Sequence, residues 1–594
     1  MTSETFFIIA ECSLAFFVAL LASSILTPIV RSRAQEWDFV DRPDGGRKAH
    51  ARPVALGGGV AVLLSALIAA GLTFAAVSGR HESIEERVAS LHKSGLSERE
   101  IVGRLQEQGD AVLPDRAQDL VAAYDANPQA YSEKHGSSVA RLKGYITKHA
   151  KEAPFFFALL ASSLLICMVG LLDDFVALPG RYKLAGQVLA ALVLIAAGLV
   201  IDRVSLFNRT YTLGIMSIPF TLFWILGAIN AINLLDGIDG LASSVGFVLS
   251  LSLATLALLL PQMHEAEAII AMVMAGSLLG FLRFNFNPAS IFLGDSGSMV
   301  IGLVIGAVAI RCSFKGVATV GLAVPFALWA IPILDSAAAI LRRKLTGRSL
   351  FATDRGHLHH SLLVRGWSVR RAVLFITFIC ALTCCGALLS YYLRNEYIAW
   401  TTVFIVAVFL AAMGIFGHVE FALVRERVRS TTRSFAGKSG RRIHESRVRL
   451  QGSQEWEHLW SALTESAEDY NIARIELTLN MPALNEAFYA NWNCDIDTAD
   501  AARSWRLVCP LVVDGRSVGQ LIVVGISPRE ASLSHIGQVA DFLDPVEDSI
   551  RKVVAEISLP AAEAADDEAS HETAELEMNG NVSQPIAHGV DENL

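Results

Sequence analysis

Residues 217–260 read SIPFTLFWILGAINAINLLDGIDGLASSVGFVLSLSLATLALLL. The apolar runs on either side of the central NLLDGIDG segment are each long enough to cross the roughly 30 Å hydrocarbon core of a bilayer as a helix. Between them lie Asn233, Asp236 and Asp239, and ionisable groups beside hydrocarbon are costly enough to be functional candidates by default. The competing interpretation is a polar helix end with a glycine turn and no ligand. The stretch predicts two membrane spans joined by a ligand-binding turn.

Apolar runs of this kind recur through most of the chain. Hydrophobic residues make up 53% of the 594 residues and charged residues 18%, with a mean hydropathy of +0.45, which is too apolar for an ordinary soluble protein. About eleven runs reach spanning length. They are residues 6–30, 56–78, 154–172, 185–201, 217–235, 241–260, 267–284, 297–312, 317–340, 372–392 and 397–417. The sequence predicts an all-α polytopic membrane protein with about eleven transmembrane helices and a small α/β domain at the carboxyl end.

The basic residues of the short loops favour one orientation. With the amino terminus outside, the inside loops carry most of the Lys and Arg, as the positive-inside bias requires. These residues are Arg31, Arg33, Arg42, Arg47, Lys48 and Arg52, then Arg181 and Lys183, then Arg342, Arg343, Lys344, Arg348, Arg355, Arg370 and Arg371. We therefore expect a multi-pass protein of the plasma membrane whose polar loops and carboxyl-terminal domain lie in the cytoplasm.

Soluble segments divide the chain into domains. The first, 79–153, has helical periodicity at 84–91 and 98–105 and is expected to be an extracytoplasmic helical insertion. The predicted domains are 1–78 for the first two spans and the first cytoplasmic loop, 79–153 for the insertion, 154–420 for the membrane core, 421–450 for a basic juxtamembrane linker, 451–558 for an α/β domain and 559–594 for a tail.

The region 451–558 has an alternating α/β pattern. A helix is expected at 456–470, strands at 473–479, 506–513 and 518–524, and a further helix at 533–557, with a hairpin at Asp514-Gly515. This order of elements resembles a GAF-type sensory module, which here would be either a small-ligand sensor or a structural, protein-binding module.

The charge of the chain is concentrated in its tail. The formal net charge is −9, and residues 560–594 hold about nine acidic residues and no Lys or Arg. The tail, 559–594, is expected to be disordered. The nearly neutral remainder gives no indication of a nucleic-acid partner.

Further polar clusters follow other spans on the same predicted side. Asp173 and Asp174 end the third span, and Lys183 follows in the same loop. Adjacent carboxylates repel, so a cation or a shared proton is needed to hold them together. The alternative is a solvated loop that only caps a helix.

Two more loops complete the set. Residues 285–298, NFNPASIFLGDSGS, surround Asp295 with small residues, which suits a hard cation that shares a diphosphate. Residues 354–362, DRGHLHHSL, carry three histidines beside Arg355. A transition-metal site is an alternative there, but no Cys accompanies the histidines, and a diphosphate-binding patch of His and Arg donors fits better.

Taken together, these motifs resemble the polyprenyl-phosphate N-acetylhexosamine-1-phosphate transferase family. The motifs are DDF followed by Lys183 and Gln187, NxxNxxDGxDGLA at 230–242, FLGDSGS at 292–298 and DRGHLHHSL at 354–362, with Arg47-Lys48-Ala-His50 in the first loop. The HLHHSL form is more similar to the branch that uses UDP-N-acetylglucosamine than to the peptidoglycan branch. The resemblance implies transfer of N-acetylglucosamine 1-phosphate to a polyprenyl phosphate, with release of UMP, at a bacterial plasma membrane.

The resemblance also implies residue roles. The implied catalytic residues are Asp173, Asp174, Lys183 and Asp236; the implied metal ligands are Asp295, Asn233 and Asp236; the implied substrate-binding residues are Asn230, Asp239, Phe292, His357, His359, His360, Arg355, Lys48 and His50. Within these sets, Lys183 would meet a phosphate and Phe292 would stack on uracil. Whether Asp173 acts as a base stays open, because the acceptor phosphate is already ionised.

The implied cofactor is Mg²⁺ or Mn²⁺, and the implied partners are polyprenyl phosphate, a UDP-N-acetylhexosamine and membrane lipid. A homodimer, and an unknown ligand or protein at the carboxyl-terminal domain, are further candidate partners. Two rival classes remain. One is a polytopic receptor or transporter with a cytoplasmic sensory module, which predicts charges near the bilayer midplane. The other is a scaffold that recruits cytoplasmic partners through its carboxyl-terminal region.

Overall fold

The structure, a computed structural model, describes residues 3–42, 52–80, 84–107, 114–129, 131, 152–207, 209–260, 264–314, 322–345, 356–415, 443–451, 455–467, 472–481, 486–494, 504–513, 516–526 and 552. Two units can be distinguished, one made of 1–43, 50–340 and 357–417 and the other of 44–49, 341–356 and 418–594.

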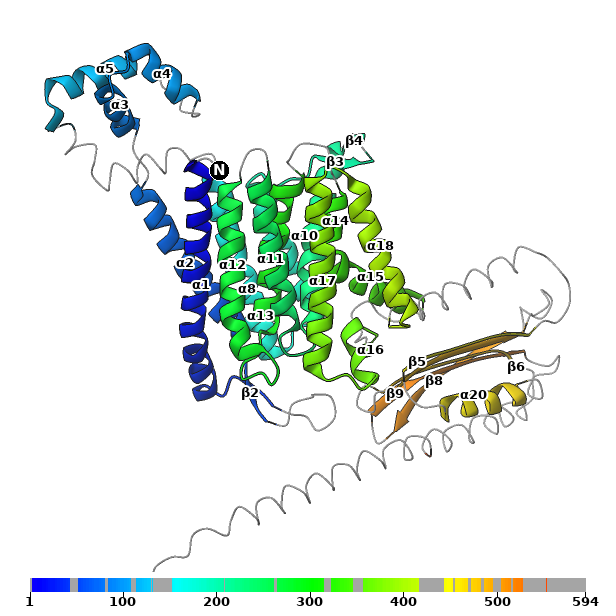
Figure 1. The fold of residues 1–594 in the computed structure, drawn as a ribbon. Helices are drawn as coiled ribbons and strands as arrows, with labels where there is room; N and C mark the ends of the chain where they lie inside the picture. Colours follow the sequence, from blue (N-terminus) through cyan, green and yellow to red (C-terminus); the bar gives the residue numbers. More distant parts are fainter. Residues whose placement is uncertain are drawn as a thin grey trace, which may run out of the picture. The chain divides into compact units, whose positions relative to one another are not determined.

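The first unit is a bundle of apolar helices (Figure 1). They are α1 (Ser3–Glu36), α2 (Gly58–Arg80), α8 (Ala153–Val176), α9 (Gly180–Ala196), α10 (Ser217–Leu235), α11 (Leu241–Leu259), α12 (Glu265–Asn285), α13 (Gly294–Ala309), α14 (Ala323–Leu328), α15 (Ala330–Leu345), α16 (Leu358–Val364), α17 (Val369–Tyr392) and α18 (Glu396–Ala412). Every residue of α13 from Ser296 to Ala309 is buried, so this helix forms the centre of the bundle.

Within the described residues, eight helices are long and apolar enough to cross a membrane, namely α1, α2, α8, α10 with the short turn before it, α11, α12, α13 with the turn after it, and α17. The protein is therefore a multi-pass membrane protein. Three of the eleven predicted spans take other forms. Helices α9 and α18 have 17 residues each, and the run 317–340 contains two helices, α14 and α15.

The break between α14 and α15 has a local cause. Helix α14 ends at Leu328, and Pro332 lies in the first turn of α15. Proline has no N–H to donate to the carbonyl four residues earlier, which here is that of Leu328. That carbonyl instead faces the Cys384 thiol of α17, with Sγ 3.8 Å from the oxygen.

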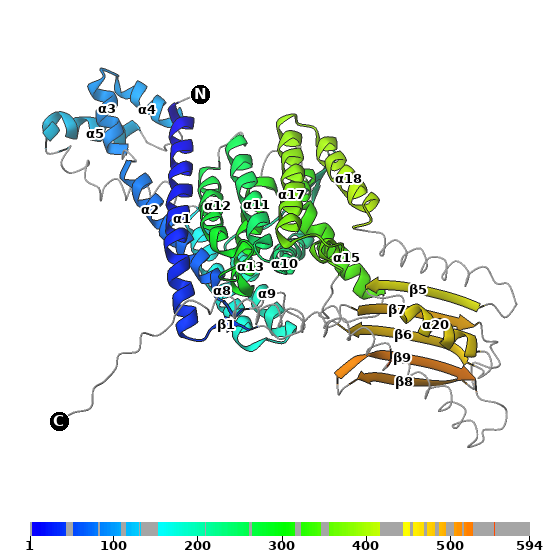
Figure 2. The same ribbon diagram turned by 60° about the horizontal axis from the view of Figure 1, so that its bottom comes forward.

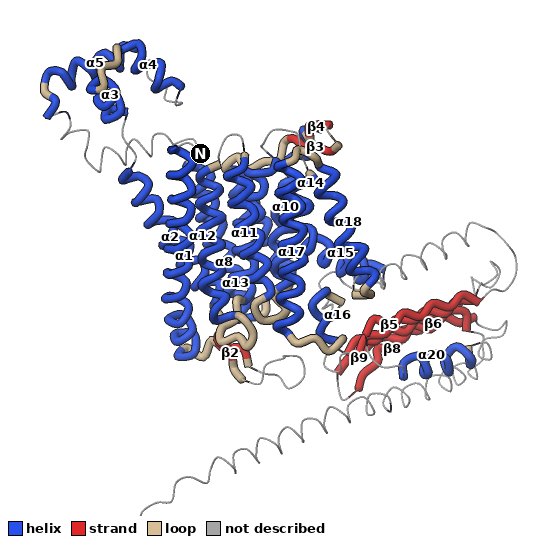
Figure 3. Tube along the Cα trace, viewed as in Figure 1, coloured by secondary structure: helices blue, strands red, loops and turns tan. Residues whose placement is uncertain are grey.

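The two ends of the bundle differ (Figures 1 and 3). One end carries the hairpin of β3 (Arg203–Leu206) and β4 (Arg209–Thr212). The other end carries the short pair β1 (Val40–Asp41) and β2 (Val54–Ala55), helix α16 and the loops that leave α10 and α12. The polar motifs lie at this second end.

The insertion forms helices, as predicted. These are α3 (Ile84–Lys93), α4 (Glu98–Glu107) and α5 (Pro114–Ala126). They share a small core of Val88, Ile101, Val102, Leu105, Ala117 and Val121.

The second unit contains a five-stranded antiparallel sheet (Figure 2). Its elements are β5 (Ile443–Gln451), α20 (Glu455–Ser466), β6 (Ile472–Met481), β7 (Glu486–Cys494), β8 (Ser504–Val513) and β9 (Arg516–Ile526), in the sheet order β5-β7-β6-β9-β8. Helix α20 buries Trp456 and Trp460 in the core of this unit. The predicted helix at 456–470 and the three predicted strands are therefore confirmed.

Two strands were not predicted. Strand β5 lies largely within 421–450, where the sequence predicts a basic linker. It pairs with β7 in antiparallel orientation. Strand β7 was missed although Phe488, Ala490 and Trp492 alternate as buried residues along it. The Asp514-Gly515 turn and the acidic tail 559–594 lie outside the described residues, and of the helix predicted at 533–557 only Lys552 is described.

Candidate active site

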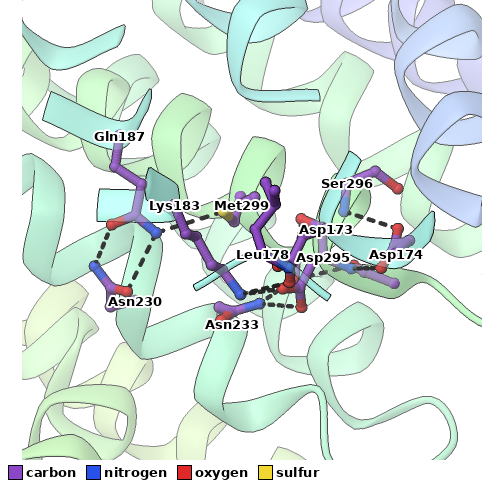
Figure 4. Close-up of polar contacts among 12 residues, drawn as sticks. Asp173, Asp174, Leu178, Lys183, Gln187, Asn230, Asn233, Asp295, Ser296 and Met299 are labelled. Atoms are coloured by element: carbon purple, nitrogen blue, oxygen red, sulfur yellow. Dashed lines mark hydrogen bonds and ion pairs between the residues drawn. The ribbon is translucent and has the colours of Figure 1, made fainter. Parts of the chain in front are cut away.

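Four helix ends bring the predicted polar residues together at one end of the bundle (Figure 4). The last turn of α8 carries Asp173 and Asp174, the first turn of α9 carries Lys183, the last turn of α10 carries Asn233, and the first turn of α13 carries Asp295. Residues as far apart in sequence as Lys183 and Asp295 are in direct contact. The separate motifs of the sequence thus form one site.

Lys183 is the central cation of this site. Its ammonium forms a salt bridge with Asp295 and lies 3.4 Å from Oδ2 of Asp173. All three side chains are at least three-quarters buried, so these charges are only partly screened by water. The other oxygen of Asp173 accepts the backbone N–H of Leu178 at 2.8 Å. Lys183 therefore offsets the repulsion between two carboxylates.

Asn233 and Asp236 complete the α10 side. The Asn233 amide donates to Oδ1 of Asp295 at 2.7 Å and lies 2.9 Å from the Ser298 hydroxyl. Asp236 directly follows α10. Burial, together with the Asp295 and Asp174 carboxylates, raises the pKa of Asp236 well above its usual range. The site therefore contains more negative charge than Lys183 alone neutralises.

Asp174 is turned toward the backbone of α13. Its Oδ1 accepts the N–H of Asp295 at 2.9 Å and its Oδ2 accepts the N–H of Ser296 at 3.3 Å. The first N–H groups of a helix have no partner within the helix, and here Asp174 supplies one, so it caps α13 from another helix. Gly294, the first residue of α13, has a φ of +71°, and a Cβ there would lie 2.6 Å from Oδ2 of Asp174. Glycine is required at this approach.

The loop between α12 and α13 is tied to the rest of the site end. Oδ2 of Asp239 accepts the Asn287 amide and the Ala289 N–H, both at 3.0 Å. The Phe292 N–H donates to the Ala55 carbonyl at 2.8 Å, which joins this loop to the first predicted cytoplasmic loop. Phe292 is half-buried. Asp239 and Phe292 thus lie on one ordered surface.

Asn230 lies apart from the carboxylates. Its amide and that of Gln187 form a reciprocal pair, with Asn230 Nδ2 donating to Gln187 at 2.7 Å and Gln187 Nε2 donating back at 3.3 Å. The Gln187 amide also lies 3.4 Å from Sδ of Met299 (Figure 4). Asn230 therefore contacts neighbouring helices, and in this structure it is engaged by protein groups.

The three histidines lie together around the start of α16. The rings of His357 and His359 are nearly parallel with centroids 5.8 Å apart, and the rings of His359 and His360 are 4.3 Å apart. His359 is 1% exposed, and its Nε2 is 2.5 Å from the position that a Cβ on Gly237 would occupy. Burial, with the neighbouring His360 next, lowers the pKa of His359 to about 3. The DRGHLHHSL motif therefore packs on the NxxNxxDGxDG turn.

Three predicted site residues cannot be placed. Lys48, His50 and Arg355 lie outside the described residues. In the other direction, Asp335 of α15 was missed by sequence reasoning. It is 2% exposed and contacts His357, but it stands alone in an apolar segment, IPILDSAAA, with no motif around it. An isolated Asp inside a predicted span was the one available signal.

The donor set suits a hard divalent cation. Carboxylate and amide oxygens, such as those of Asp295, Asn233 and Asp236, are the ligand types that Mg²⁺ and Mn²⁺ take. Within the described part of the chain, no three His, Cys, Asp or Glu side chains are gathered as a set of metal ligands. Asp295 has the Lys183 ammonium as its counter-ion instead.

Comparisons with known proteins identify the family. The model of glycosyl transferase family 4 matches residues 156–313, which contain the site residues from Asp173 to Asp295. The chain is 32% identical to a probable undecaprenyl-phosphate N-acetylglucosaminyl 1-phosphate transferase of Bacillus subtilis (strain 168) over 281 residues, 47% of this chain and 76% of the relative.

Two further relatives fall in the same group. The chain is 37% identical over 244 residues to a decaprenyl-phosphate N-acetylglucosaminephosphotransferase of Mycolicibacterium smegmatis, covering 36% of this chain and 57% of the relative. It is 30% identical over 231 residues to a phospho-N-acetylmuramoyl-pentapeptide-transferase of Caldanaerobacter subterraneus, covering 37% and 71%. The chain therefore belongs to glycosyl transferase family 4, the polyprenyl-phosphate N-acetylhexosamine-1-phosphate transferase family.

Proposed function

We propose that this protein transfers N-acetylglucosamine 1-phosphate from UDP-N-acetylglucosamine to polyprenyl phosphate, releasing UMP and forming the first lipid-linked sugar of a cell-envelope polysaccharide. The names of the Bacillus and Mycolicibacterium relatives describe this type of reaction. The observation that carries the proposal is the convergence of Asp173, Lys183 and Asp295 at one end of a membrane bundle.

The reaction joins two anions, so the site must offset their repulsion and align them. An oxygen of the acceptor phosphate attacks the phosphorus that carries the sugar, the bond to UMP breaks, and UMP leaves with that electron pair. The acceptor is already ionised, so no base is needed to deprotonate it. Lys183 contacts both Asp173 and Asp295 and can shift from these carboxylates to a phosphate oxygen.

The cation is a proposal of the same kind. Asp295, Asn233 and Asp236 would hold Mg²⁺ or Mn²⁺, and the ion would neutralise charge on the donor diphosphate. Asp174 positions this group, because it holds the backbone of Asp295. Asp173 shares Lys183 with Asp295, and we assign Asp173 to the side of the lipid phosphate.

The donor would lie across the turn after α10 and the loop before α13. Phe292, which is half-buried and bonded through its backbone to Ala55, would stack on uracil, and Asp239 lies beside the same loop. His359 packs against Gly237, and the cluster of His357, His359 and His360 would meet the diphosphate, together with Arg355, Lys48 and His50. Asn230 would contribute by keeping Gln187 in place.

We also propose eleven membrane crossings. Besides the eight long helices, α9 leads from Lys183 toward the β3–β4 hairpin at the other end. The Leu322 N–H, just before α14, donates to the Ser205 carbonyl of that hairpin at 2.8 Å, so α14 and α15 together would return toward the site.

Helix α18 supports the same count. It begins where the ring of Tyr397 lies 6.1 Å from that of Phe207, next to the hairpin, and ends where Arg365, just after α16, donates to the Met413 carbonyl at 2.6 Å. An odd number of crossings, with the basic loops at the site end, would place the site and the carboxyl-terminal domain in the cytoplasm of a bacterial inner membrane.

The rival classes are weaker. The receptor or transporter alternative is not supported, because the curated relatives are named as transferases and the carboxylates gather at helix ends. A ligand or protein partner of the GAF-like domain, and a homodimer, are compatible additions to a transferase and do not compete with it.

The test is release of UMP from UDP-N-acetylglucosamine by the purified protein with undecaprenyl phosphate, with and without Mg²⁺. We expect release that depends on both lipid and metal. No release with this donor or with other UDP-N-acetylhexosamines would contradict the proposal, whereas release without the lipid would indicate a hydrolase.

A further inference from the structure

The carboxylate of Asp335 joins α15 to the histidine cluster. Its Oδ2 lies 2.9 Å from Nδ1 of His357, and its Oδ1 accepts the backbone N–H of Leu358 at 2.8 Å. The side chains of Asp335 and His357 are 2% and 5% exposed. Both oxygens of one buried carboxylate are therefore engaged by two consecutive residues of the DRGHLHHSL motif.

These contacts determine how His357 carries its protons. A carboxylate only accepts hydrogen bonds, so Nδ1 of His357 must be the donor. Nε2 is then the one ring nitrogen left to meet a substrate. When a phosphate oxygen approaches, a proton on Nε2 makes the ring an imidazolium that donates on both sides, and the carboxylate stabilises that charge.

The Asp335 carboxylate also determines the position of the histidine cluster. The Leu358 N–H belongs to the first turn of α16, so its bond to Asp335 fixes the start of that helix. His359 follows one residue later and lies against Gly237, next to the Asp236 end of α10. A shift of α16 would move all three histidines relative to the turn after α10.

We propose that Asp335 is a positioning residue of the transferase: it holds His357 with Nδ1–H toward the carboxylate and Nε2 toward the donor diphosphate, and it anchors α16 so that the histidine cluster meets that diphosphate. This inference rests on the proposed function. Asp335 acts through His357, because both of its carboxylate oxygens are engaged by His357 and Leu358.

Asp335→Asn tests the proposal. The side chain keeps its size, but an NH2 donor replaces one of the two oxygens, so either the Leu358 N–H or the His357 Nδ1–H loses its acceptor. We expect the KM for UDP-N-acetylglucosamine to rise about tenfold or more, as for other residues that orient a functional histidine, with little change in the KM for undecaprenyl phosphate. An unchanged donor KM would overturn the proposal.

A double-variant cycle separates positioning from general destabilisation. If Asp335 acts through His357, Asp335→Asn adds little to the effect of His357→Gln, whereas independent roles would give multiplied effects. Asn395→Ala is the matched control. The Asn395 side chain caps α18 by accepting the Tyr397 N–H at 3.0 Å, and this cap lies at the β3–β4 end of the bundle, away from the histidines. That variant loses a helix cap and should keep the donor KM of the wild type.

A readout that needs no turnover completes the test. Histidine side chains labelled with ¹⁵N report which ring nitrogen is protonated, and His357→Gln assigns the signal. In the wild-type protein we expect a proton on Nδ1 of His357; a neutral ring protonated only on Nε2 would refute the pair even if Asp335→Asn fails to fold. An inactive wild type with Nδ1 protonated would instead refute the proposed function and leave the pair standing.

Discussion

The carboxylate of Asp174 accepts the backbone N–H of Asp295 at 2.9 Å, so the last turn of α8 caps the first turn of α13. Two helices that are far apart in sequence are joined at the residue proposed to bind the metal. The same helices approach closely one turn earlier, because a Cβ on Gly170 would lie 2.4 Å from the Cα of Ser296. The position of Asp295 therefore depends on α8 as much as on α13.

Asp174→Ala should reduce both stability and activity. Loss of a helix cap costs about 1–2 kcal/mol, and Asp295 would lose the group that holds its backbone. A lower Tm together with strongly reduced UMP release is expected. Asp174→Asn keeps one acceptor oxygen, so its Tm and its UMP release should lie between those of the wild type and those of Asp174→Ala. A Tm equal to that of the wild type in Asp174→Ala would show that the cap contributes nothing.

Asp295→Asn should abolish transfer while the protein stays inserted and folded. The substitution removes the charge that pairs with Lys183 and the proposed metal ligand, but keeps the size of the side chain. UMP release and size-exclusion elution measure the two properties. Asp202→Asn, an exposed Asp beside Arg203 of the opposite hairpin, is the matched control and should be fully active. Near-normal turnover in Asp295→Asn would disprove the metal assignment.

Gly237→Ala should disturb the histidine cluster. The added Cβ would lie 2.5 Å from Nε2 of His359, so the ring must move. We expect a higher KM for the UDP-sugar with a small change in Tm. Gly227→Ala, within α10 and upstream of this turn, is the control, since a Cβ there meets nothing within 4 Å. Equal kinetics in the two variants would mean that the contact has no role in donor binding.

The buried His359 predicts a loss of stability in acid. Burial lowers the pKa of His359 to about 3, whereas the unfolded chain protonates it near 6.5. Between these values the unfolded state binds more protons, so stability falls as pH drops, by about 1.4 kcal/mol for this group at one unit below its unfolded pKa. The Tm of His359→Gln should therefore fall less than that of the wild type between pH 7 and pH 5.5. Parallel curves for both proteins would contradict this.

Removal of residues 421–594 should leave the transferase active. The described site residues lie between Asp173 and His360, and the buried core of the helical bundle ends at Ile415. UMP release by the shortened protein is expected to stay within about twofold of the full chain, since no described residue of the proposed mechanism belongs to the removed segment. Complete loss of activity with intact folding would favour a direct role of the carboxyl-terminal domain.

The apolar periodicity and the position of the polar motifs were readable without a structure. Runs of apolar residues must become helices in a bilayer, because backbone groups find no other hydrogen-bond partners there. Eight of the predicted spans became long helices, whereas the run at 317–340 contains a break that Pro332 explains. Strand β7 was missed although its buried residues alternate with more exposed ones such as Asn493, which is typical of a half-covered sheet.

The sequence by itself determined that this is a polytopic membrane enzyme of one family, because apolar run length and ordered polar motifs are local properties. Tertiary structure alone decided which motif residues touch. Lys183 contacts both Asp173 and Asp295, Asp174 turns to the backbone of α13, and Asp335 contacts His357. Such pairings depend on how helices pack and where their ends meet. Two residues over a hundred positions apart share no local sequence pattern from which their contact could be predicted.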